Sequence, residues 1–241
     1  MRVFSLMILL GGGLVSTAHA DEARDWLNRS AKAEAQSFQG TFVYERNGNF
    51  STHGIWHQAD ADGSVRERLL QLDGPAQEVL RVNGQPQCVS SGLVDQMGDA
   101  QLPASMLDPL RLADEYDLQV IGRSRIAGRD AVVLAVVPHD QHRYAVELYL
   151  DEQTSLPLKS LLISEKGQLL ERFQYVSLDT LSALPDESLR PGEACKPVTL
   201  TKVSEPVKPS WQAGWVPPGF ALNQSLQRKS PASADTVACL V

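Results

Sequence analysis

The sequence predicts a mainly β (α+β) protein, built on one strongly curved antiparallel sheet with few helices. Turn signals recur at short intervals, at Asn47-Gly48, Asp62-Gly63, Asp73-Gly74 and Asn83-Gly84. Asn-Gly and Asp-Gly suit two-residue hairpins, because both central residues need a positive φ. The strand-like runs between these turns predict a meander of antiparallel strands. Several runs carry apolar residues on both faces, which favours a curved sheet with helices on one side and a cavity.

The first twenty residues are predicted to be a secretory signal peptide. Arg2 precedes an apolar run that is too short to span a bilayer, and Ala18-His19-Ala20 fits a cleavage site after Ala20. No cysteine follows the run directly, so we expect a soluble periplasmic protein without a lipid anchor. Loss of Arg2 changes the formal net charge from −7 to −8. This acidic balance argues against nucleic-acid binding.

A helix is predicted over Asp21–Gln36, where Ala23, Trp26 and Leu27 share one face. We expect Trp26 to anchor this helix in the core. In the strand that follows, Phe38, Gly40, Phe42 and Tyr44 share a face.

In the next strand, Thr52, Gly54 and Trp56 lie opposite Ser51, His53, Ile55 and His57. Residues 93–115 interrupt the strand rhythm and are expected to form a loop with short helices. Further strands are predicted over 118–126, 129–137, 144–150, 156–164 and 168–178. About ten strands with short connections predict an open barrel or a single curved sheet.

Proline spacing divides the chain. We predict a large domain over 21–184, a proline-rich linker over 185–210 and a smaller β domain over 211–241. The last segment is too short to bury a core of its own, so this second domain is expected to be incomplete.

The sequence shows no catalytic or cofactor motif, so we expect neither enzymatic activity nor a cofactor. His53 and His57 lie ~13 Å apart on a strand, too far to share a metal ion, and we predict no metal site. The turn at His139 and His142 is expected to be an ordinary polar turn. Two of the three cysteines, Cys88, Cys195 and Cys239, can pair in an oxidising compartment, but their spacing does not say which two.

Basic residues cluster at two places, Arg66 with Arg68 and Arg123 with Arg125 and Arg129. Such clusters suit phosphate or carboxylate groups, but charges of this kind also protect sheet edges from aggregation, and for each cluster we favour this second role.

Several runs resemble the MucB/RseB family. They include residues 25–29, 37–48, 51–57, 66–74, 140–144, 156–162 and 165–173, and Trp215-Val-Pro-Pro-Gly-Phe220 resembles the start of that family's second domain. The resemblance covers the whole chain after the predicted signal peptide.

The resemblance implies a LolA/LolB-like unclosed antiparallel β-barrel with packed helices, followed by a smaller antiparallel β domain. It also implies a periplasmic negative regulator of an envelope-stress sigma factor, in a pathway that controls alginate in mucoid pseudomonads. The implied partner is the periplasmic part of a transmembrane anti-sigma factor, which the regulator shields from proteolysis. The implied stress signals are lipopolysaccharide or lipoprotein acyl chains. Members of the family continue past position 241, so the resemblance leaves undecided whether this chain binds the partner.

We predict that Phe42, Tyr44, Trp56 and Leu148 line an apolar cavity for acyl chains, on the strength of their apolar and aromatic character. Alternation alone does not decide which face of the sheet lines it. The alternative function is a soluble periplasmic carrier of lipoproteins or lipids. Self-association into a homo-oligomer stays open.

Overall fold

The computed structural model describes residues 16–90, 114–198, 214–220, 225–229 and 236–240. Contacts divide the chain into a large unit that ends at Lys196 and a second unit that begins at Pro197. Residues 93–113 of the predicted loop, 1–15 of the predicted signal peptide and 199–210 of the predicted linker lie outside the described residues.

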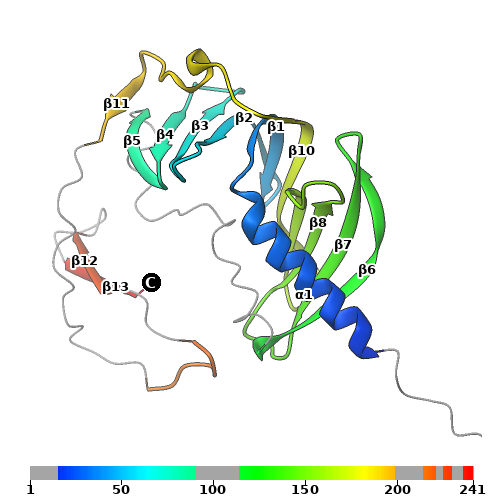
Figure 1. The fold of residues 1–241 in the computed structure, drawn as a ribbon. Coiled ribbons are helices and arrows are strands. Elements are labelled where there is room, and N and C mark those ends of the chain that lie inside the picture. The colour runs from blue at the N-terminus through cyan, green and yellow to red at the C-terminus, as the bar shows by residue number, and fades with distance from the viewer. Residues whose placement is uncertain (1–15, 91–113, 199–213, 221–224, 230–235, 241) are drawn as a thin grey trace, which may run out of the picture. The chain divides into compact units, whose positions relative to one another are not determined.

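The large unit is one antiparallel sheet of eleven strands. Its strands run in the order β11-β5-β4-β3-β2-β1-β10-β9-β8-β7-β6, so the two halves of the chain join where β1 pairs with β10. The sheet curves without closing (Figure 1), which confirms the predicted unclosed antiparallel architecture. The strand bounds are β1 Ser37–Arg46, β2 Asn49–Ala59, β3 Val65–Gln71, β4 Glu78–Val82, β5 Gln85–Ser90, β6 Tyr116–Ile126, β7 Arg129–Pro138, β8 Ala145–Asp151, β9 Pro157–Ile163, β10 Leu169–Leu181 and β11 Cys195–Pro197.

The turns follow the sequence, with one difference. Asn47-Gly48 and Asn83-Gly84 form two-residue connections in which both residues have positive φ. The Asp-Gly pairs instead lie in longer loops, and there only the glycine has positive φ. In these loops Asp62 accepts a hydrogen bond from the Ser64 amide, as in an Asx turn, and Asp73 accepts one from the Thr52 amide of β2.

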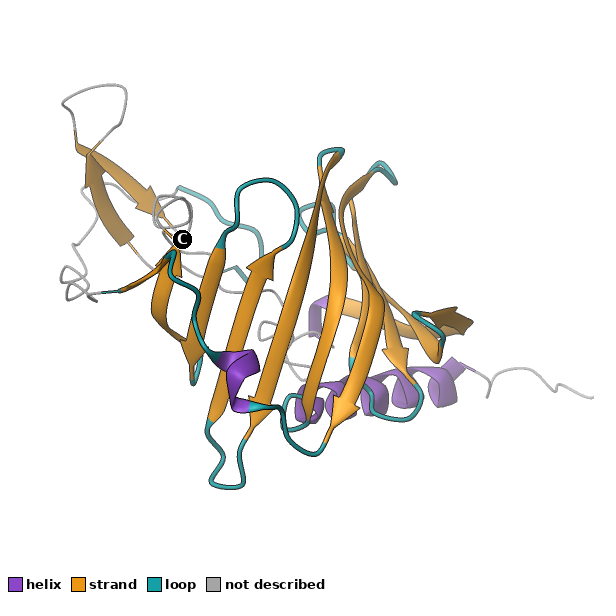
Figure 2. Ribbon diagram, turned by 90° about the horizontal axis from the view of Figure 1, so that it is seen from above, coloured by secondary structure: helices purple, strands orange, loops and turns teal. Residues whose placement is uncertain are grey.

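The helix α1 (Ser16–Ala33) packs against one face of the sheet. Ala23, Trp26 and Leu27 are buried against apolar residues of β6, β7 and β8, which confirms Trp26 as a core anchor. The helix ends three residues before the predicted Gln36. We call the face that carries α1 the inner face and the opposite one the outer face (Figure 2). Among the described residues, no helix has the length and apolar character needed to cross a membrane.

The large unit extends past position 184, where proline spacing placed the start of the linker. The 3₁₀ turn η2 (Asp186–Leu189) and strand β11 still belong to it. The reason is burial, since Leu184 and Leu189 are both less than a tenth exposed. In the second unit, β12 (Ser225–Lys229) and β13 (Thr236–Leu240) pair as an antiparallel hairpin.

Candidate functional site: the inner face of the sheet

A continuous row of side chains crosses the inner face from the middle of the sheet to the edge beneath α1. Directly paired residues in antiparallel strands point to the same face, so the register identifies the row. Its members, in strand order from β1 through β10 to β6, are Tyr44, Phe173, Ser160, Leu148, Leu134 and Val120. Two predicted cavity residues, Tyr44 and Leu148, therefore lie on the same face and in the same row.

The third predicted residue, Phe42, is the centre of an aromatic cluster beside this row. Its ring centroid lies 4.8 Å from that of Phe173, 5.9 Å from that of Tyr175 and 5.1 Å from that of His53. Phe42 and Tyr175 are buried, whereas Tyr44 and Phe173 are partly exposed. The partly exposed rings of Tyr44 and Phe173 therefore form an aromatic surface, called the aromatic floor below, that rests on the buried rings of Phe42 and Tyr175.

Trp56, the fourth predicted residue, lies on the outer face. Its cross-strand partners are Gln39 and Arg68, and the Arg68 guanidinium lies 4.9 Å from the indole centroid. The ring covers Gly54, where an added Cβ would meet it at 2.9 Å. Trp56 therefore does not share a surface with Phe42, Tyr44 and Leu148.

Sequence reasoning did not select Phe173 and Tyr175, which complete the cluster. The strand that carries them was predicted, but nothing in it indicated which neighbours its aromatic rings would meet. The available signal was the spacing of the two aromatics at i and i+2, which places both on one face of a strand.

A buried ionic group lies on the same face at the end of α1. His57 stacks on Phe38 with ring centroids 4.6 Å apart, and its two ring nitrogens contact the Glu34 backbone carbonyl oxygen and the Glu67 carboxylate. Glu67 also accepts a hydrogen bond from Arg81. Burial opposes a charge on His57, but these two acceptors outweigh it and raise the pKa of the imidazole.

His57 therefore joins the end of the helix segment to strand β2. His53 stacks on Phe42 and bonds the Ser51 hydroxyl, and burial lowers its pKa. Both histidines thus have local packing roles in the aromatic face.

Four of the five arginines in the basic clusters pair with carboxylates of the same chain. Arg66 binds Asp60, Arg68 binds Glu78, and Arg129 binds Asp151. Arg123 contacts Glu22 of α1 and Glu152. For these four residues, carboxylates of the same chain satisfy the guanidinium groups, so they are not a ready phosphate site.

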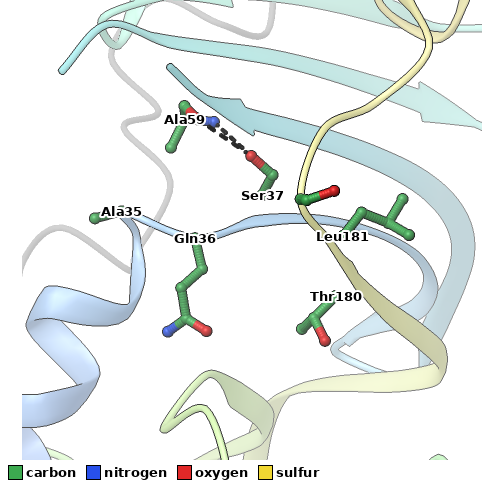
Figure 3. A pocket seen from close by; sticks show the side chains of 7 residues that line it. Ala35, Gln36, Ser37, Ala59, Thr180 and Leu181 are labelled. Carbon is green, nitrogen blue, oxygen red and sulfur yellow. Dashed lines mark hydrogen bonds between the residues drawn. The ribbon is translucent and has the colours of Figure 1, made fainter. Parts of the chain in front are cut away.

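Two open pockets lie away from the aromatic cluster. One, of about 350 Å³, is lined by Ala35, Gln36, Ser37, Ala59 and Thr180–Ser182, where α1 leads into β1 (Figure 3). In it, the Ser37 hydroxyl accepts a hydrogen bond from the Ala59 amide at 3.1 Å. The other, of about 660 Å³, lies around the polar turn at 137–145. Neither is lined by a predicted cavity residue, so the acyl-chain cavity stays a prediction.

Comparison with known proteins gives one consistent result. A family model described as the MucB/RseB N-terminal domain matches residues 22–193. The chain is 57% identical over 243 residues to the sigma factor AlgU regulatory protein MucB of Pseudomonas aeruginosa, covering 100% of this chain and 77% of that protein. It is 31% identical over 229 residues to the sigma-E factor regulatory protein RseB of Salmonella typhimurium, covering 90% of this chain and 70% of that protein.

Solved structures agree with the sequence comparison. A crystal structure of MucB in complex with MucA(peri) superposes with a TM-score of 0.79 at 56% identity, covering 90% of this chain and 74% of that one. A crystal structure of MucB alone gives a TM-score of 0.74, also at 56% identity, covering 91% of this chain and 75% of that one.

Proposed function

The chain belongs to the MucB/RseB family, and from this premise we propose that it is a periplasmic negative regulator of an envelope-stress sigma factor. It acts by binding the periplasmic part of a transmembrane anti-sigma factor and shielding that segment from proteolysis. The observation that carries this proposal is the 56% identity and TM-score of 0.79 to MucB solved with MucA(peri). Identity of this size over nine-tenths of the chain supports a retained binding surface.

A binding measurement with the intact chain tests this function. Isothermal titration with the purified periplasmic segment of the anti-sigma factor should show saturable binding. The same segment, incubated with its initiating protease, should be cleaved more slowly when the chain is present. A chain that takes up acyl chains yet does neither would be a lipid carrier, and the regulator would be rejected.

We further propose that the inner face senses lipid. An acyl chain that inserts beside Tyr44 and Phe173 would extend the aromatic floor above Phe42. Leu148 belongs to the same cross-strand row but is 5% exposed and packed beneath α1, so it supports this face from the core and does not line the lipid site. Burial of each further methylene stabilises such a complex by about 0.8 kcal/mol. Lipid weakens partner binding only if the lipid binds more tightly to the protein in its partner-free state than in its partner-bound state.

Two aspartate substitutions on opposite faces test the lipid site. Phe173→Asp puts a charge on the inner floor and should abolish binding of a fluorescent acyl probe. Trp56→Asp, a matched aromatic-to-acid change on the outer face, should leave probe binding intact. Equal loss in both variants, with both folded by circular dichroism, would contradict the inner-face assignment.

Export is the remaining part of the proposal. Cleavage after Ala20 would remove the first five residues of α1 and leave the buried residues Ala23, Trp26 and Leu27 in place. Mass spectrometry of the protein recovered from the periplasm should therefore find Asp21 at the amino terminus. An intact Met1 on the recovered protein would reject cleavage at this position.

A further inference from the structure

Residues 182–197 cross the sheet as a strap. They leave the end of β10, pass β1, β2, β3 and β4, and reach β11 beside β5 (Figure 1). The strap lies on the outer face, because η2 and α1 are on opposite sides of the sheet (Figure 2). The chain thus crosses half of the sheet before it continues into the second unit.

Each of the strands β2, β3, β4 and β5 holds the strap. The Leu184 amide donates to Gln58 Oε1 of β2 at 2.7 Å, and Arg68 Nη1 of β3 donates to the Ser188 carbonyl oxygen at 3.1 Å. The remaining two contacts complete the series. The Gly192 amide donates to Glu78 Oε2 of β4 at 2.9 Å, and Cys195 forms a disulfide with Cys88 of β5.

The contact at Glu78 is built to fit a glycine. The Glu78 side chain is only 4% exposed, and Arg68 Nε donates to it at 2.6 Å. A Cβ at Gly192 would lie 2.9 Å from Glu78 Oε2. A side chain at this position would therefore require either the strap or the buried, charge-paired carboxylate to move.

These contacts determine where the second unit is attached. With the strap closed, the chain leaves the sheet at β5. Without it, the chain would be free from the end of β10, five strand spacings or ~24 Å away. The freed residues would add a flexible segment with an r.m.s. length of about 20 Å to the connection between the units.

We propose that the strap is a disulfide-locked clasp that keeps the second unit tethered at β5. The consequence for binding rests on the proposed function. Where both units contact one partner segment, a shorter tether raises the effective concentration of the second contact, and a longer tether lowers it. The closed clasp therefore strengthens the hold on the anti-sigma segment without contacting it.

Two variants of the intact chain open the clasp in different ways. Gly192→Ala crowds the contact between the strap and Glu78, and Cys88→Ala/Cys195→Ala removes the covalent anchor of the strap. The matched control is Gly122→Ala, where an added Cβ meets nothing within 4 Å. Circular dichroism establishes that the sheet is folded in each variant.

Hydrogen exchange and small-angle X-ray scattering measure directly whether the strap is closed or open. Exchange at the Leu184 and Gly192 amides should rise at least tenfold in both opening variants, and the radius of gyration should increase. Gly122→Ala should match the wild type in both measurements. Strap amides that keep wild-type protection in Cys88→Ala/Cys195→Ala, or an unchanged radius of gyration in that variant, would overturn the proposal.

Partner binding separates this inference from the proposed function. Affinity for the periplasmic anti-sigma segment should fall about threefold in the opening variants, because the freed strap roughly doubles the tether length. It should stay at the wild-type value in Gly122→Ala. An open strap with unchanged affinity would overturn the role of the clasp in binding, while the regulator function would stand. Absence of binding by the wild type would reject the regulator function. Hydrogen exchange and scattering would then decide by themselves whether the strap tethers the second unit.

Discussion

Loss of the Cys88–Cys195 disulfide should be the largest single loss of stability that one bond in the large unit can cause. The two cysteines are 107 residues apart in sequence, and both are less than a tenth exposed. A crosslink that closes a loop of about 100 residues lowers the entropy of the unfolded chain by an amount equivalent to about 4.7 kcal/mol at 25 °C. Measured values for native disulfides are about 2–5 kcal/mol, so we expect a loss near the upper end of that range.

Guanidinium unfolding, followed by far-ultraviolet circular dichroism, measures this loss in Cys88→Ala/Cys195→Ala. With a denaturant slope of about 4 kcal/mol per molar, the midpoint should fall by about 1 M. Cys239→Ala is the matched control, because it removes a cysteine and leaves the disulfide intact. A midpoint shift below about 0.3 M would refute the loop-closure reasoning.

Three further predictions concern the sheet itself. The pKa of His57 is raised above 6.5 in the folded state, so the charged imidazole stabilises the fold fully below pH 6.5, and this contribution is lost as the pH rises through the folded pKa. In thermal unfolding, His57→Gln should therefore destabilise the protein more at pH 5.5 than at pH 8. A difference in stability between variant and wild type that does not change with pH would contradict this. Gly40→Ala would place a Cβ 2.5 Å from the Ser177 carbonyl oxygen and should cost about 1–3 kcal/mol in chemical denaturation, whereas a cost below about 0.5 kcal/mol would show that the backbone yields. Asp151 is 1% exposed and binds Arg129, so Asp151→Asn should cost about 3 kcal/mol by the same assay, and near-neutral stability would count against a structural ion pair.

Local patterns predicted the elements of this fold well. The Asn-Gly turns carry their conformational requirement in two adjacent residues, and the structure has positive φ at all four. The helix was predicted because Ala23, Trp26 and Leu27 recur at helical spacing, and they are buried as that spacing implies. Such signals act over a few residues, so a single sequence displays them completely.

The grouping of residues into a site required the register between strands. Trp56 and Phe42 belong to neighbouring strands, and each was correctly placed on one face of its own strand. The pairing of Gln39 with Trp56 and of Phe42 with His53 decides that these two faces are opposite ones. Register depends on how whole strands align, so residue character alone did not separate the outer tryptophan from the inner cluster.

The sequence by itself determined a curved antiparallel meander, a helix anchored by Trp26, and the family to which these motifs point. Only the tertiary structure decided which two cysteines pair, and that the proline-rich segment after β10 is a strap over the outer face. The reason is distance along the chain. Cys88 and Cys195, or Glu78 and Gly192, are separated by more than a hundred residues and meet only after the strands between them have paired.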